Sequence, residues 1–160
     1  MNTQGNKQPT FSFELFPPKT AEGMEKLKQT VQQLNAAEPL YFSCTYGAGG
    51  STRERTFETV SWLRSQGIET APHLACIGSD KEEIHDIVRF YIEQGITRIV
   101  ALRGDLPSGM GRVGLGTFRY ANELVTFLRE KYGDHFHIEV AAYPEFHPQA
   151  PTAAADLANF

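Results

Sequence analysis

The chain alternates between short apolar runs and longer segments with a helical pattern. The apolar runs are rich in β-branched and aromatic residues, as buried strands are, and the segments between them carry apolar residues at three- and four-residue spacing. Strand starts recur at intervals of about 30 residues, the length of one βα unit. Successive units of this kind predict an α/β fold with a parallel sheet and right-handed crossovers. The predicted strands are 10–16, 39–46, 69–76, 97–103 and 137–143, and the predicted helices are 21–37, 52–67, 79–95 and 117–133.

The ends of the helical segments carry residues that commonly begin or end helices. Ser79 precedes a first turn rich in acidic residues and is the predicted N-cap of the third helix. Gly67, Gly95 and Gly133 each follow a helical segment, where a left-handed residue often ends the helix. A fifth helix begins within residues 151–160.

Two architectures are compatible with five such units. One is an open flavodoxin-like sheet, and the other is the first five strands of a (β/α)8 TIM barrel, which normally needs about 250 residues. The length of 160 residues favours the open sheet, whereas a fifth helix that begins so close to the last residue favours a truncated barrel. We expect residues 1–9 to be a disordered tail and residues 10–160 to form one folded domain.

Composition narrows the possible function classes. The net charge is −4 and the isoelectric point is about 5.7, which gives no indication of a nucleic-acid-binding surface. Cys44 and Cys76 are too few for a disulfide framework, and the polar first ten residues do not resemble a secretory leader. No apolar run approaches the roughly 20 residues of a membrane span. We therefore expect a cytoplasmic protein that binds neither nucleic acid nor membrane.

Residues able to ionise or to form hydrogen bonds lie at or just beyond the carboxyl-terminal part of every predicted strand. Both architectures bind ligands at the carboxyl ends of their strands, and strand ends that served only packing would not need such residues. Their convergence on one edge of the sheet is the strongest residue-level indication of a functional site. The residues at these strand ends are Glu14, Thr45, Tyr46, His73, Arg103, Asp105, Tyr143, Glu145 and His147.

Single members of this set leave other interpretations open. Glu14 is flanked by aromatic and aliphatic residues, and loss of hydration would suit it to general acid catalysis, although an outward-facing strand glutamate fits equally well. Arg103 and Asp105 can form a structural ion pair, and His73 can be a core histidine. Arg103, Gly104 and Asp105 also form the cell-attachment tripeptide Arg-Gly-Asp. An adhesion motif must be displayed outside the cell, however, and this tripeptide directly follows a predicted buried strand.

Two further patterns are weak. Gly109, Gly111 and Gly114 match the dinucleotide-binding fingerprint literally but do not follow a strand directly, so a loop over the site is the better interpretation. His135 and His137 alternate as metal ligands can, yet no cysteine or carboxylate cluster completes such a site. We expect no metal.

Five stretches together resemble a known family. They occur in the family's order and near its spacing, and the fourth and fifth are individually specific. The sequence is similar to methylenetetrahydrofolate reductases of the bacterial type over residues 11–160. The stretches are "FELFPP" (13–18), "TYGAGGSTRERT" (45–56), "APHLACIG" (71–78), "IVALRGDLP" (99–107) and "AAYPEFHPQA" (141–150).

The resemblance implies a (β/α)8 barrel that binds FAD at its strand ends, of which this chain supplies the first five strands. NADH or NADPH would reduce the flavin, and the reduced flavin would convert 5,10-methylenetetrahydrofolate to 5-methyltetrahydrofolate. We expect the full-length enzyme to be a homo-oligomer and the 160-residue segment alone to be inactive. The alternative is a flavin-binding α/β module without folate chemistry.

The resemblance also assigns roles to residues. Glu14 would be the general acid that helps to open the imidazolidine ring of the folate. Asp105 would lie beside both flavin and pterin, and Thr45 would lie near the nicotinamide. The remaining FAD contacts would be Tyr46, Ala48, His73, Arg103, Gly104, Tyr120, Ala121, Tyr143, His147, Asp156 and Asn159.

Overall fold

A computed structural model describes residues 9–46, 50–105, 116–143, 145–147 and 150–159. Within these ranges every predicted strand and helix is present, although the strands are shorter than the apolar runs that predicted them. The strands are β1 (Phe13–Leu15), β2 (Phe42–Cys44), β3 (Thr70–Ala75), β4 (Arg98–Leu102) and β5 (His137–Val140). The helices are α1 (Ala21–Asn35), α2 (Gly50–Ser65), α3 (Lys81–Glu93), α4 (Ala121–Tyr132) and α5 (Ala153–Asn159).

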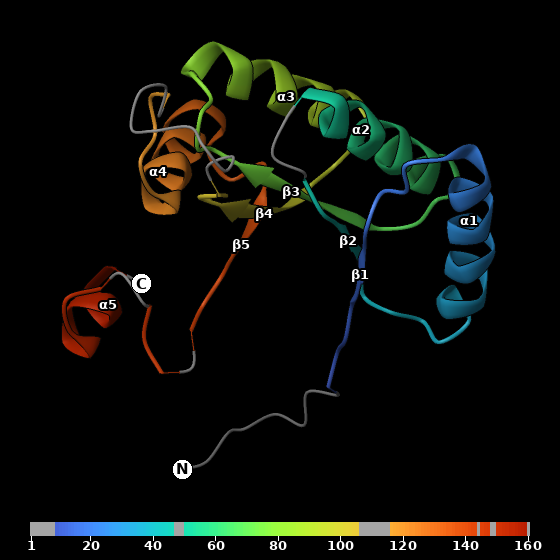
Figure 1. The fold of residues 1–160 in the computed structure, drawn as a ribbon, viewed down its shortest axis with the longest axis horizontal. Coiled ribbons are helices and arrows are strands. Elements are labelled where there is room, and N and C mark those ends of the chain that lie inside the picture. The colour runs from blue at the N-terminus through green and yellow to red at the C-terminus, as the bar shows by residue number, and fades with distance from the viewer. Residues whose placement is uncertain (1–8, 47–49, 106–115, 144, 148–149, 160) are drawn as a thin grey trace.

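The strands form one parallel sheet in the order β1-β2-β3-β4-β5. Figure 1 shows α1, α2, α3 and α4 on the same side of this sheet. A doubly wound flavodoxin-like sheet would place β1 between other strands and would carry helices on both faces. Sequential strand order with helices on one side is the arrangement of consecutive units of a (β/α)8 barrel. The fold is therefore α/β, with the first five strands of such a barrel, and the open-sheet alternative is wrong.

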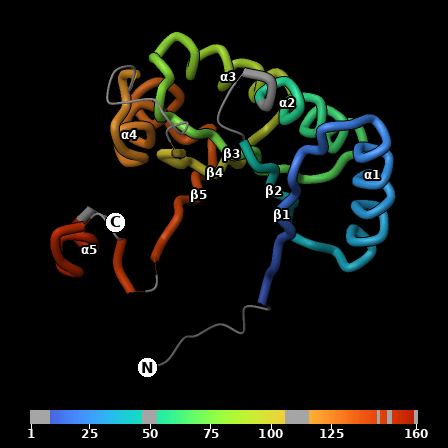
Figure 2. Tube along the Cα trace, viewed as in Figure 1, coloured from blue at the N-terminus to red at the C-terminus, as the bar shows by residue number. Residues whose placement is uncertain are grey.

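The fifth helix is the exception to this layering. Figures 1 and 2 show α5 apart from the sheet and on the side away from α1 to α4. Its Leu157 is 76% exposed, so α5 buries little apolar surface within the described part of the chain.

Alternation along the strands separates the two faces of the sheet. In β4, Ile99 and Ala101 are fully buried beneath the helices. Val100 and Leu102, which alternate with them and point to the other face, are only half-buried. In β1, Leu15 is buried against the helices while Glu14 is exposed. We call the side that α1 to α4 leave bare the uncovered face.

The hydrophobic core lies between the sheet and the helices. Its larger part surrounds α3, whose Ile84, Ile87, Val88 and Tyr91 are all fully buried. The three- and four-residue spacing of these residues and Ile92 in the sequence predicts one apolar face of the helix. Ile92 is half-buried against the same cluster. A smaller cluster joins α1 to β1 and β2 and contains Leu15, Val31, Phe42, Leu63 and Ile68.

The glycine helix ends are confirmed, and the predicted cap of α3 is wrong. Gly67, Gly95 and Gly133 all have positive φ angles, of 71°, 70° and 56°. The N-cap of α3 is Asp80, one residue after the predicted Ser79. Asp80 Oδ1 accepts a hydrogen bond from Glu83 N at 2.8 Å, and Glu83 Oε2 accepts one from Asp80 N at 3.1 Å. This reciprocal capping box satisfies two backbone donors, which Ser79 cannot do from its position.

Loss of this cap should destabilise the protein measurably. We expect Asp80→Ala to lower the free energy of unfolding by about 1 kcal/mol, because the Glu83 amide loses its acceptor. Asp80→Asn is the matched control and should cost much less, since an amide oxygen also caps helices well. Urea unfolding followed by circular dichroism measures both variants. Equal losses in the two would show that the carboxylate charge, and not the cap hydrogen bond, stabilises the start of α3.

A charged cluster occupies the uncovered face near the amino ends of β4 and β5. Arg98 Nη1 lies 2.5 Å from Glu139 Oε1, and His137 Nε2 lies 3.4 Å from the same oxygen. The Arg98 guanidinium also stacks 4.8 Å from the centre of the Tyr41 ring. The contacts among these four side chains occupy the amino-terminal part of the uncovered face. The candidate site lies toward the carboxyl ends of the strands.

Candidate functional site

The site begins with two side chains that the sheet register brings together. Glu14 of β1 pairs with Ser43 of β2, and Ser43 pairs with Ala71 of β3. Since residues two apart on a strand share a face, His73 lies on the same side as Ala71 and therefore as Glu14. The His73 Nε2 and Glu14 Oε2 atoms are 3.8 Å apart. The sequence placed both residues at strand ends, and the structure makes them neighbours.

The two side chains differ strongly in burial. The His73 side chain is 11% exposed, and the Glu14 side chain is 50% exposed. Burial lowers the pKa of His73, and the nearby Glu14 carboxylate opposes this shift only in part. The imidazole is thus predominantly neutral near pH 7. Glu14 keeps its contact with solvent, because its carboxylate lies on the uncovered face. The loss of hydration expected from its aromatic and aliphatic neighbours in the sequence is therefore not seen.

The turn after β4 is held against the end of β3. The Arg103 carbonyl accepts a hydrogen bond from Ile77 N at 2.8 Å. Gly104 has a φ angle of 79°, and a Cβ atom there would lie 2.9 Å from the Ala75 Cβ. Only glycine therefore fits between the turn and β3 without a shift of one of them.

The charged residues of this turn are only loosely paired. Arg103 Nη2 lies 3.9 Å from Asp105 Oδ1, and the Asp105 side chain is fully exposed. An exposed ion pair of this length contributes little to stability. Arg103 Nε also donates to the Gly104 carbonyl at 3.2 Å. The ion pair therefore gives little structural reason for the two charges, and the Asp105 carboxylate is exposed at the strand end.

A buried thiol connects this turn to the start of α4. Cys76 Sγ lies 3.8 Å from the Arg103 carbonyl and 3.7 Å from the Tyr120 carbonyl, in donor geometry to both. Burial raises the pKa of Cys76 to about 11, so the thiol keeps its proton and remains a donor. Tyr120 is the N-cap residue of α4, its side chain is exposed, and Ala121 begins the helix. The sequence predicts no role for Cys76, because no local sequence pattern indicates that a cysteine thiol contacts the backbone carbonyls of two separate loops.

Thr45 and Tyr46 continue the chain beyond β2. Thr45 N donates to the Leu15 carbonyl at 2.9 Å, and the Thr45 carbonyl accepts from Thr56 Oγ1 at 3.0 Å. Tyr46 is half-buried against the larger core cluster. Burial raises its pKa, so the phenol is neutral at physiological pH.

The residues after β5 form a separate group. The Tyr143 and His147 rings meet edge to face with their centres 4.9 Å apart. His147 N donates to Asp156 Oδ2 at 2.9 Å, which fixes the start of α5 to this loop. His147 thus contacts two other predicted cofactor residues, Tyr143 and Asp156.

Some predicted positions lie outside the described part of the chain. They are Ala48, the side chain of Asn159, and Gly109, Gly111 and Gly114 of the literal fingerprint. The predicted tail, residues 1–9, is likewise outside except for its last residue. In the described ranges, no group of three or more metal-ligating side chains is found, and no helix is long and apolar enough to cross a membrane.

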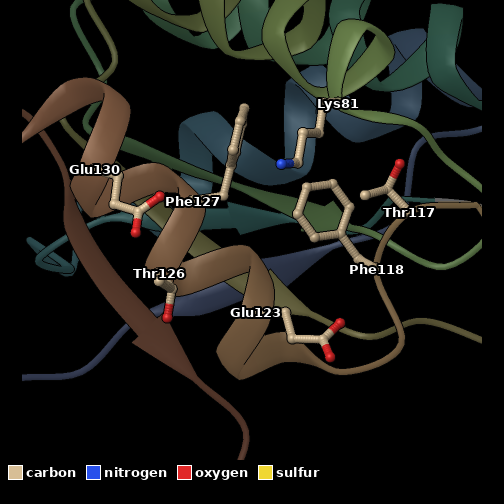
Figure 3. Close-up of a pocket in the computed structure, with 7 residues that line it drawn as sticks. All are labelled: Lys81, Thr117, Phe118, Glu123, Thr126, Phe127 and Glu130. Atoms are coloured by element: carbon tan, nitrogen blue, oxygen red, sulfur yellow. The ribbon is translucent and has the colours of Figure 1, made fainter.

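A hollow of about 320 Å³ lies between the start of α3 and α4 (Figure 3). It contains none of the predicted site residues. The Glu123 carboxylate at its rim accepts a hydrogen bond from Arg119 N at 2.6 Å, and the Lys81 ammonium lies 6.0 Å from the centre of the Phe127 ring. Its lining residues are Lys81, Thr117, Phe118, Glu123, Thr126, Phe127 and Glu130.

Comparison with known proteins decides the family. The sequence model of methylenetetrahydrofolate reductase matches residues 1–160. The chain belongs to the methylenetetrahydrofolate reductase family. The resemblance read from the five sequence stretches is confirmed.

Relatives in bacteria and plants are similar over nearly the whole chain. The 5,10-methylenetetrahydrofolate reductase of Escherichia coli (strain K12) is 45% identical over 149 residues, which cover 92% of this chain and 48% of that protein. The enzyme of the same name from Buchnera aphidicola is 43% identical, over 92% of this chain and 49% of that protein. Methylenetetrahydrofolate reductase (NADH) 1 of Zea mays is 40% identical, over 94% of this chain and 26% of that protein. The chain thus spans about half the length of its bacterial relatives.

Membership of the methylenetetrahydrofolate reductase family explains why polar residues gather on the uncovered face. In a closed (β/α)8 barrel the side of the sheet opposite the helices is the barrel interior, and ligands bind where it opens at the strand ends. Glu14 and His73 lie on this face, and the Arg103–Asp105 turn follows β4. The roles of these residues stay predictions.

Proposed function

We propose that this chain forms the first half of the barrel of an FAD-dependent enzyme that reduces 5,10-methylenetetrahydrofolate to 5-methyltetrahydrofolate with NADH or NADPH. The observation that carries the proposal is a half-exposed carboxylate, Glu14, that lies 3.8 Å from a buried neutral histidine on the uncovered face, in a chain of this family. Relatives named as 5,10-methylenetetrahydrofolate reductases support the substrate. Cytoplasmic location and homo-oligomeric assembly stay predictions from the sequence.

The residues present are chemically suited to FAD. Arg103 offers a cation and a planar donor group to an anionic cofactor, and its turn contains a glycine that admits close backbone approach. Tyr120 and Tyr143 are large exposed rings, 58% and 50% accessible, that flat cofactor rings can cover. When bound, FAD would supply hydride transfer between the nicotinamide and the folate. His73, Arg103, Tyr120, Tyr143 and His147 would hold it.

Glu14 would contribute the proton chemistry. A protonated Glu14 would donate from its carboxyl oxygen to a ring nitrogen of the folate, which would open the five-membered ring to a cation able to accept hydride. Its exposure on the uncovered face leaves it accessible to a substrate, whereas a glutamate packed against the helices would not be. Asp105, fully exposed after β4, would accept hydrogen bonds from the folate.

One experiment tests the proposal against the simpler flavin-binding module. The complete gene product is purified, its visible absorption spectrum is recorded, and it is mixed with NADH or NADPH and then with 5,10-methylenetetrahydrofolate. We expect a yellow protein that the nicotinamide bleaches and the folate recolours, with 5-methyltetrahydrofolate detected by mass spectrometry. Bleaching without recolouring would favour the flavin-binding module without folate chemistry. A colourless protein that does not take up added FAD would overturn the proposal.

A further inference from the structure

The contact between Glu14 and His73 joins two strands that are not neighbours in the sheet. β2 lies between β1 and β3, and Ser43, the register partner of both Glu14 and Ala71, is 6% exposed. A small side chain at this position leaves room for the longer Glu14 and His73 to meet above it. The 3.8 Å between their nearest atoms is longer than a hydrogen bond, and catalytic hydrogen bonds commonly shorten when substrate binds.

The surroundings of His73 hold it in one place. The residues on either side of it in β3, Pro72 and Leu74, are buried, and its own carbonyl accepts a hydrogen bond from the Tyr91 hydroxyl at 3.5 Å. Burial keeps the imidazole neutral, as its lowered pKa indicates. A neutral imidazole carries a single N–H, which it can direct at an acceptor.

Other charged groups on the uncovered face have different partners. Arg98 and His137 both contact Glu139 across β4 and β5. Arg103 lies 3.9 Å from Asp105 and donates to the Gly104 carbonyl at 3.2 Å, in the turn after β4. The β2 residues of this face that the sheet places between the pair are uncharged. Among the described residues, Glu14 is the only charged group that contributes to the pKa shift of His73.

From this geometry we infer that His73 is a positioning residue for Glu14: its Nε2–H donates to the Glu14 carboxylate that is left once the carboxyl proton has moved to the folate. The inference rests on the proposed function. The proton leaves Glu14 for a ring nitrogen of the substrate, no bond at His73 breaks, and the hydrogen bond stabilises the negative charge that appears on Glu14. A donor to the charged form of an acid favours its ionisation, so His73 would lower the barrier to proton loss from a Glu14 that is protonated.

Two amide substitutions separate this role from simple packing. A glutamine side chain places its NH2 group near the position of Nε2, whereas an asparagine side chain reaches only to the position of Nδ1. On the acidic plateau of the pH profile, where Glu14 is protonated, we expect His73→Gln to keep most of the rate of folate reduction and His73→Asn to lose about ten- to hundredfold, the range for a lost charge-assisted hydrogen bond. Because His73 is also a proposed FAD contact, flavin reduction by the nicotinamide is measured at saturating FAD in both variants. The ratio of the rate of folate reduction to the rate of flavin reduction should fall about ten- to hundredfold in His73→Asn and little in His73→Gln, since only the folate step needs the acid.

A double-mutant cycle with Glu14→Gln completes the test in the complete gene product. If His73 acts through Glu14, His73→Asn combined with Glu14→Gln should reduce folate no more slowly than Glu14→Gln alone. The alkaline limb of the rate of folate reduction should also move to higher pH in His73→Asn. Additive losses in the cycle, or equal losses in both steps, would overturn the inference and leave His73 as a flavin contact. Absence of folate reduction in the unsubstituted protein would instead reject the proposed function.

Discussion

Glu14→Gln is expected to slow the reduction of 5,10-methylenetetrahydrofolate by orders of magnitude while the nicotinamide still reduces the bound flavin. Glutamine is nearly the same size and remains polar, but it has no proton to donate, so only the step that needs an acid should fail. General acid catalysis contributes about 10²- to 10⁴-fold, which sets the expected loss in the folate step. Stopped-flow absorbance of the flavin, mixed first with NADH or NADPH and then with folate, measures the two steps separately.

A matched control uses the same chemical change on the helical side of the sheet. Glu22 lies in the exposed first turn of α1, where it pairs with Lys26 at 2.8 Å. Glu22→Gln should leave both steps unchanged. If Glu14→Gln slowed flavin reduction as much as folate reduction, Glu14 would be a residue of the cofactor site and not an acid. The exposure of Glu14 on the uncovered face makes the first outcome the expected one.

The fold was largely predictable from the sequence, because the apolar spacing within each helix and the glycines at the helix ends indicate the same elements. Helical spacing in α3 alone identified Ile84, Ile87, Val88 and Tyr91 as a buried face, and all four are buried. Glycines marked three helix ends correctly. The choice between an open sheet and a barrel segment was not predictable from such local signals, because it depends on strand order and on which face the helices cover.

The site was predictable as a set of strand ends but not as a set of contacts. Strand register is fixed by packing across the sheet, so the sequence could not show that Glu14 and His73 lie 3.8 Å apart across β2. The missed residues, Ser43 and Cys76, act through their small size or through their bonds to backbone carbonyls. Such roles leave no pattern in a single sequence, whereas charged residues after apolar runs do.

The glycine that precedes α4 is expected to tolerate no side chain. Gly116 has a φ angle of 68°, and a Cβ atom there would lie 2.3 Å from the Ser79 carbonyl oxygen and 2.7 Å from the Ser79 nitrogen. These neighbours are backbone atoms, so they cannot rotate away. The adjacent Thr117 N donates to the Ser79 carbonyl at 3.0 Å, and a forced separation would break this bond as well.

Gly116→Ala should therefore destabilise the protein far more than its φ angle alone requires. Gly67 is the matched control, because its φ angle is 71° and no atom lies within 4 Å of the position of an added Cβ. We expect Gly67→Ala to cost about 1 kcal/mol for the left-handed conformation, and Gly116→Ala to cost about 2 to 3 kcal/mol more from the clash. Urea unfolding curves of the two variants give the difference directly. Similar losses would mean that the segment before α4 can move away from Ser79, and then α4 and its Tyr120 would not be fixed to the end of β3 as the Cys76 contact implies.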